Sequence, residues 1–204
     1  MTKRENKRTR RALLIAVLAL VVCVATIGGT VAWLTANTAP VTNTFTPSDI
    51  TITLTEDGTT VNEETKEATK SYKMVPGQVL DKNPTVGVVA GSEPCWVFVK
   101  VEKSSNYDTF ITSSIDDSVW SPLPGYDGVY FIKKDNSEAA TYPVLTGNKV
   151  TVKNTVTKEM MQGLTEANYP NIGFKAYAIQ QANIVKGEED ETIEVTAWKL
   201  VSAS

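Results

Sequence analysis

Histidine, the side chain that most often serves as a general base or a metal ligand, is absent from all 204 residues. The chain therefore lacks the Ser-His-Asp and Cys-His arrangements of nucleophilic catalysis and every histidine-ligated zinc site. Asp116 and Asp117 do not form a catalytic pair, because adjacent residues of a strand point to opposite faces of a sheet. These residue types argue against an enzyme and predict that the protein needs no metal or other cofactor.

Four consecutive acids at residues 188–191 are possible calcium ligands. Calcium-binding loops place Asp and Gly at fixed intervals, and that spacing is missing here. A solvated surface loop is the favoured interpretation, and a calcium site is the alternative.

The two cysteines differ in their surroundings. Cys23 lies within an apolar run and follows Val22, where a lipid-modified cysteine would need a small residue, so a lipoprotein is disfavoured. Cys95 alternates in phase with Val97 and Val99, which predicts a small buried hydrophobe rather than a reactive thiol. One cysteine outside the apolar run allows no internal disulfide.

Charge is distributed unevenly along the chain. Residues 1–32 hold six bases and one acid, whereas the remainder holds 14 bases and 22 acids, a balance of −8. An acidic body repels phosphate backbones, so nucleic acid is not an expected partner.

The basic head is followed by the uncharged apolar residues 12–27 and then by small residues, as in a secretory signal. Thr30 and Ala32 occupy the two positions that a signal peptidase inspects. We expect cleavage after Ala32, which makes Trp33 the mature N-terminus. Signal peptidase is then a partner during export.

An uncleaved anchor is the alternative, because residues 12–34 form an uncharged stretch of 23 residues, enough to span a bilayer. Both interpretations leave the basic head in the cytoplasm and the rest outside. The expected location is extracellular or at the cell surface, with membrane contact only through the N-terminal segment.

We expect three parts in the chain: a signal peptide or anchor at residues 1–32, a flexible arm at residues 33–43, and a domain at residues 44–204. Pro40 and Pro47 prevent the region around the arm from being a central strand. We expect residues 33–46, the arm and the start of the domain, to add to the edge of a neighbouring subunit, which predicts self-association; the anchoring residues are Trp33, Leu34, Val41 and Phe45. A passive stem between membrane and domain is the alternative.

Patterns in the domain favour strands over helices. A threonine cap and Gly163 near its end predict a short helix at residues 157–164. The last stretch, residues 192–201, fits a strand and a helix equally well. Alternation predicts strands at residues 50–54, 86–89, 96–102, 129–132, 150–156 and 172–180, with 96–102 central and 150–156 at an edge or exposed on one face.

Seven to nine short strands with turns about every ten residues predict a mainly β chain. The expected fold is an antiparallel β-sandwich with one or two short helices, preceded by an N-terminal hydrophobic signal helix.

The segment from Gly28 to Thr35, with residues 43–46 and the strand at 50–54, resembles the start of the exported TasA/camelysin-type proteins of Gram-positive bacteria. Residues 175–180 and Ala197-Trp198 are similar to the closing segment of clostridial members. The resemblance implies processing by a SipW-type signal peptidase, a jelly-roll sandwich, and assembly into biofilm fibres. Camelysin-type members have also been labelled metallopeptidases. The present sequence does not fit that label, because it has no histidine to hold zinc.

Two functions from different classes remain. The first is a structural protein of the extracellular matrix that polymerises or is retained at the surface. The second is a monomeric surface module that binds glycan or host protein through loops at residues 104–118 or 122–127. Three aromatic residues in or near these loops can line a sugar site or pack in the core; they are Trp120, Tyr126 and Tyr130.

Overall fold

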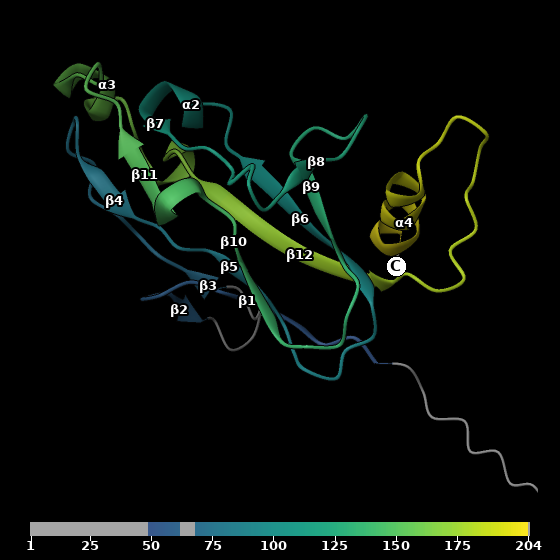
Figure 1. Cartoon of the computed structure of the whole chain (residues 1–204). Coiled ribbons are helices and arrows are strands. Elements are labelled where there is room, and N and C mark those ends of the chain that lie inside the picture. The colour runs from purple at the N-terminus through teal and green to yellow at the C-terminus, as the bar shows by residue number, and fades with distance from the viewer. Residues whose placement is uncertain (1–48, 62–67, 204) are drawn as a thin grey trace, which may run out of the picture. The chain divides into compact units, whose positions relative to one another are not determined.

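A computed structural model describes residues 49–61 and 68–203, all within the unit Pro47–Ser204 (Figure 1). This part is mainly β, and its strands pair antiparallel throughout, as the sequence predicts. Within the same residues, no helix has the length and apolar character needed to cross a membrane. The signal segment, the cleavage site and the arm lie outside the described residues.

The elements follow one another along the chain with short connections. Helices are α2 (Tyr107–Phe110), α3 (Lys158–Gln162) and α4 (Ile193–Ser202), with 3-10 turns η1 (Thr146–Asn148) and η2 (Glu166–Asn168). The strands are β1 (Ile52–Thr55), β2 (Thr60–Val61), β3 (Ala68–Thr69), β4 (Val79–Asp81), β5 (Thr85–Val88), β6 (Cys95–Lys103), β7 (Ile111–Thr112), β8 (Ser121–Pro122), β9 (Val129–Lys134), β10 (Ala140–Pro143), β11 (Lys149–Val152) and β12 (Ile172–Gln180).

Four sheets have the strand orders β1-β5-β10, β4-β11-β7, β12-β6-β9-β8 and β2-β3. The first two are connected, because β4 leads into β5 while its partner β11 follows β10. At the junction, residues 82–84 lie opposite residues 144–148, and the extra residues turn through Gly147 (φ 62°) and Asn148 (φ 56°). This bulge lets one long ladder change direction between its two halves.

The main core lies between the sheets β1-β5-β10 and β12-β6-β9-β8, which face each other. Val86 and Val88 enter it from β5, and Cys95, Val97 and Val99 enter from β6, all at most 2% exposed. Strand β6 is central in its sheet and becomes exposed only at its end, as predicted.

Helix α4 covers the outer face of β12 and β6 (Figure 1) and resolves the ambiguous C-terminal stretch as a helix. Trp198 lies 5.4 Å from Phe98 and 5.2 Å from Tyr177, measured between ring centroids. Leu200 lies on this helix but is 53% exposed.

A third cluster forms around β11 and α3. The Thr157 side chain accepts a hydrogen bond from the Met160 N–H, so the predicted helix and its cap are confirmed. The strand predicted at residues 150–156 ends at Val152, because Asn154 and Thr155 turn the chain toward α3. It is exposed on one face, but it is central between β4 and β7 rather than at an edge.

Candidate functional site

Cys95 lies where the sequence predicts. It is fully buried in the main core, and burial raises the pKa of its thiol while the nearby Lys134 ammonium lowers it less. A buried thiol whose protonated form is favoured is a packing residue and a poor nucleophile.

The aromatic residues named for a sugar site divide between core and surface. Trp120 is 1% exposed, and its indole N–H donates to the Pro143 carbonyl at 2.8 Å, so it belongs to the core. Tyr126 packs edge-on against Trp198 beneath α4. Tyr130 is half-buried and reaches the groove described next.

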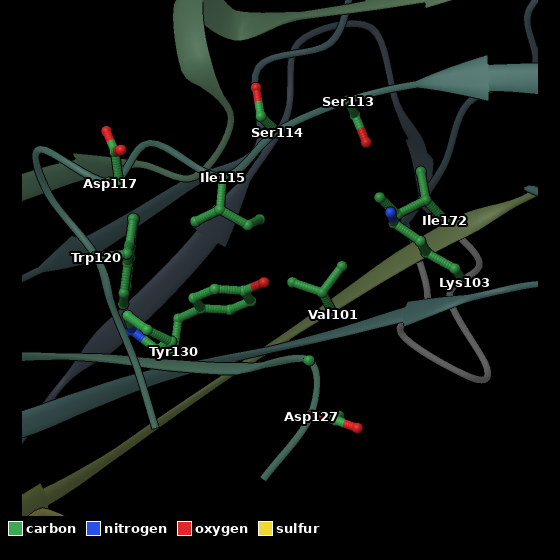
Figure 2. A pocket seen from close by; sticks show the side chains of 12 residues that line it. Val101, Lys103, Ser113, Ser114, Ile115, Asp117, Trp120, Asp127, Tyr130 and Ile172 are labelled. Carbon is green, nitrogen blue, oxygen red and sulfur yellow. The ribbon is translucent and has the colours of Figure 1, made fainter. Parts of the chain in front are cut away.

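A groove of about 750 Å³ lies between the two loops named above, at the end of β6 and the start of β9. Figure 2 shows Ile115, Tyr130 and Val101 converging on its interior, with Asp117 and Asp127 at opposite sides. The apolar interior and polar rim are typical of a binding surface.

Charge at the rim is mainly negative. Asp117 and Asp127 are exposed, and no ion pair joins either to another described residue. Lys103 is the basic residue of the lining, and its ammonium pairs with Asp108 at 2.9 Å. The groove therefore favours neutral or cationic groups.

A second feature is the outer edge of β12. This nine-residue strand pairs with β6 on one side only. Hydrogen bonds at its two ends, from the Ser104 N–H to Asn171 O and from the Gln181 N–H to Pro94 O, fix the pairing pattern. The odd-numbered residues of β12 bond to β6, and the even-numbered residues direct their N–H and C=O groups outward.

Outward backbone groups of Phe174, Ala176 and Ala178 have no backbone partner within the described part of the chain. Their side chains point into the main core, yet all three are only half-buried. The equivalent side chains of β6, such as Val97 and Val99, are 0% exposed. The core along β12 is therefore incompletely covered.

The other free edges are short or carry proline. Strands β1, β4 and β7 have four, three and two residues. Strand β8 ends in Pro122, and β10 has Pro143 at an outward-facing position, where it offers no N–H. Proline at an edge prevents another strand from adding there. Strand β12 contains no proline and is the longest edge strand in the residues described; β1 approaches it without pairing to it.

Of the acidic residues 188–191, Glu191 contacts α4 through its side chain. The Glu191 carboxylate pairs with Lys199 at 2.6 Å and accepts a hydrogen bond from the Thr196 hydroxyl at 3.4 Å. Within residues 49–61 and 68–203, no three His, Cys, Asp or Glu side chains gather as metal ligands would.

The sequence predicts β12 as a strand, and the loops that it suggests for binding, residues 104–118 and 122–127, border the groove. It does not predict that β12 lies at the edge of its sheet. Edge position depends on which distant strands pair, and local alternation carries no such information. The cleavage residues Thr30, Ala32 and Trp33 and the arm residues Leu34, Val41 and Phe45 lie outside the described residues.

Comparison with known proteins finds no matching family model, no matching curated protein and no matching solved structure.

Proposed function

We propose that this chain is an exported structural protein of the cell surface or extracellular matrix, whose subunits join when the N-terminal arm of one adds as a strand to the next. In this proposal a signal peptidase cleaves after Ala32, and Trp33 begins the mature chain. The finer fold we propose is a jelly roll, in keeping with the resemblance to TasA/camelysin-type proteins.

The observation that carries the proposal is the edge of β12. Its outward amides lack partners among the described residues, and its inward side chains are half-buried, so an added strand would satisfy the amides and complete the core. Ala176 and Ala178 have small side chains, so they present little bulk to an incoming strand at this edge.

The arm has the pattern that this edge needs. Val41 and Phe45 are four positions apart in the sequence. Their side chains therefore share one face of an extended segment, and both can point into the core along β12. Pro40 interrupts pairing at one position and limits the register. A head-to-tail contact of this kind leaves one arm and one edge free at the two ends, so it propagates into a filament.

Proline at an outward-facing position of β12 tests the acceptor edge. Ala178→Pro removes an N–H that makes no bond to β6, so the sheet is expected to persist while an added strand loses a donor. Thr141→Pro is the matched control, because it removes an outward-facing N–H from β10.

Electron microscopy of the processed chain should show fibres for the parent and for Thr141→Pro, and monomers for Ala178→Pro. Thermal unfolding should confirm that both variants are folded. Fibres from a folded Ala178→Pro chain would exclude β12 as the acceptor.

Export has its own test. N-terminal sequencing of secreted material should begin at Trp33. Recovery of only full-length, membrane-bound chain would contradict cleavage and leave an anchored protein with the same topology.

The second candidate function is a monomeric surface binding module, which the groove beside Tyr130 favours. A glycan or a host protein would contact the apolar interior and the carboxylates of Asp117 and Asp127. A glycan array probed with the processed chain and with Asp127→Asn distinguishes the candidates, together with size-exclusion chromatography. A monomer that binds one glycan class, and loses it in the variant, would favour this module.

A further inference from the structure

A second cavity, of about 510 Å³, lies between residues 70–74, strand β4 and residues 169–172. It opens onto the third apolar cluster and shares Ile172 with the lining of the groove beside Tyr130. Six apolar side chains line it: Met74, Leu80, Ile111, Val150, Met161 and Ile172. A cavity of this volume and composition is of the kind that encloses small apolar ligands.

Methionine is concentrated at this cavity. The chain has four methionines. Met74, Met160 and Met161 all pack in the third cluster, and the fourth is Met1. Methionine has an unbranched, flexible and polarizable side chain, so it adapts to a ligand without fixed shape. The lining therefore suits a flexible apolar chain better than a rigid ring.

Two lysines, Lys70 and Lys82, line the cavity. The partners of their ammonium groups differ in charge. Lys82 is 8% exposed, and its ammonium pairs with Glu56 at 2.9 Å. The Lys70 ammonium donates to the Asp57 carbonyl at 2.8 Å and lies 5.1 Å from the Tyr72 ring centroid. Both of these Lys70 contacts are with uncharged groups, and no ion pair joins Lys70 to an acid within residues 49–61 and 68–203, so among these residues its positive charge is available to an anion.

We propose that this cavity binds an acyl chain carrying an anionic headgroup, with the chain among the methionines and the headgroup at Lys70. A free fatty acid and an anionic membrane phospholipid share this chemistry. The proposal does not depend on strand donation, because the cavity and the arm are separate features.

Photoaffinity labelling of the full chain tests it. The chain is placed in nanodiscs of zwitterionic lipid and exposed either to a photoactivatable fatty acid or to a photoactivatable phosphatidylglycerol, and labelled residues are mapped by mass spectrometry. Mapping separates labels in the cavity from labels in the apolar residues 12–34, whose hydrophobicity alone can bring them into a bilayer.

Lys70→Glu should lower cavity labelling about tenfold, as expected for loss of one charge-assisted hydrogen bond. Lys186→Glu is the matched control, because Lys186 is also an exposed-loop lysine whose ammonium donates to a backbone carbonyl, that of Glu189. Met161→Trp, which fills the cavity, should lower labelling without removing charge.

Cavity labelling by the fatty acid alone would assign a soluble ligand, and labelling by the phosphatidylglycerol would assign a membrane source. Labels confined to residues 12–34, or equal cavity labelling in Lys70→Glu and Lys186→Glu, would overturn the proposal. Equal labelling by a photoactivatable fatty alcohol would also overturn it, because an alcohol carries no anion.

Discussion

Lys82 and Glu56 form the most deeply buried ion pair among the described residues, with side chains 10% and 11% exposed. The Lys82 ammonium also lies 5.4 Å from the Phe174 ring centroid, and the Tyr72 hydroxyl donates to the Glu56 carboxylate at 2.8 Å. Burial, followed by that carboxylate, raises the pKa of Tyr72, so the phenol stays protonated and remains a donor. These contacts join the end of β1 to β4 and β12.

Removing one partner of this pair should cost more than removing both. Lys82→Met leaves the Glu56 carboxylate buried without its cation, so we expect a loss of about 3 kcal/mol in the free energy of unfolding. Lys82→Met combined with Glu56→Met should lose less, because no buried charge remains. Urea unfolding of the two variants measures the difference, and an equal or larger loss in the double variant would contradict this account.

At the scale of elements, α4 is held by contacts with the loop that precedes it. Glu191 pairs with Lys199, and the Thr196 hydroxyl, which donates toward Glu191, accepts a hydrogen bond from the Gly187 N–H at 3.1 Å. The hydrogen bond from Lys199 holds the pKa of the Glu191 carboxyl below its ordinary value of 4.5. The ionised carboxylate thus favours the docked helix.

The pH dependence of α4 follows from the sign of that shift. A carboxyl whose pKa is lower in the folded state adds stability above its unfolded pKa, and loses it as pH falls through the folded pKa. The protection factors of the Thr196 to Trp198 amides, which correct hydrogen exchange for the intrinsic effect of pH, should therefore fall below about pH 4. Glu191→Gln should exchange faster at neutral pH and lose this pH dependence, and an unchanged profile in the variant would contradict the role of Glu191.

Sequence patterns predict elements where one periodicity dominates. Strand β12 has the predicted bounds, and β6 extends the predicted strand by one residue at each end. The sequence of α4 fits two patterns. Ile193, Val195 and Ala197 alternate as in a strand, whereas a helix would place four residues on one face: Ile193, Ala197, Leu200 and Val201. Packing of Trp198 against the sheet decides between them, and that contact depends on residues far away in sequence.

Short strands and edges escape such patterns. Strands β7 and β8 have two residues each and exist only through their partners. The central place of β11 arises because β4 and β7 pair with it from distant parts of the chain. The groove and the free edge of β12 likewise depend on which distant strands pair with one another, so local sequence patterns do not predict them.

For the whole molecule, we expect stability that does not depend on a metal. Histidine is absent, and the acids near residues 188–191 include Glu191, whose carboxylate already pairs with Lys199. Thermal unfolding with and without a strong chelator should give the same midpoint. A midpoint lowered by several degrees in chelator would reveal a calcium site, because a ligand that binds only the native state raises its stability.

Assembly by strand donation makes the arm and the edge of β12 complementary halves of one contact. A chain lacking residues 33–43 keeps the acceptor edge but loses the donor, and Ala178→Pro keeps the donor but loses the acceptor. Neither should polymerise alone, because each can form the contact on one side only.

An equimolar mixture of these two variants gives the most direct test, by size-exclusion chromatography with light scattering. The account predicts a heterodimer that contains one copy of each variant and grows no further. A mixture that remains monomeric, or a deletion variant that alone forms the fibres of the intact processed chain, would contradict donation of the arm to β12.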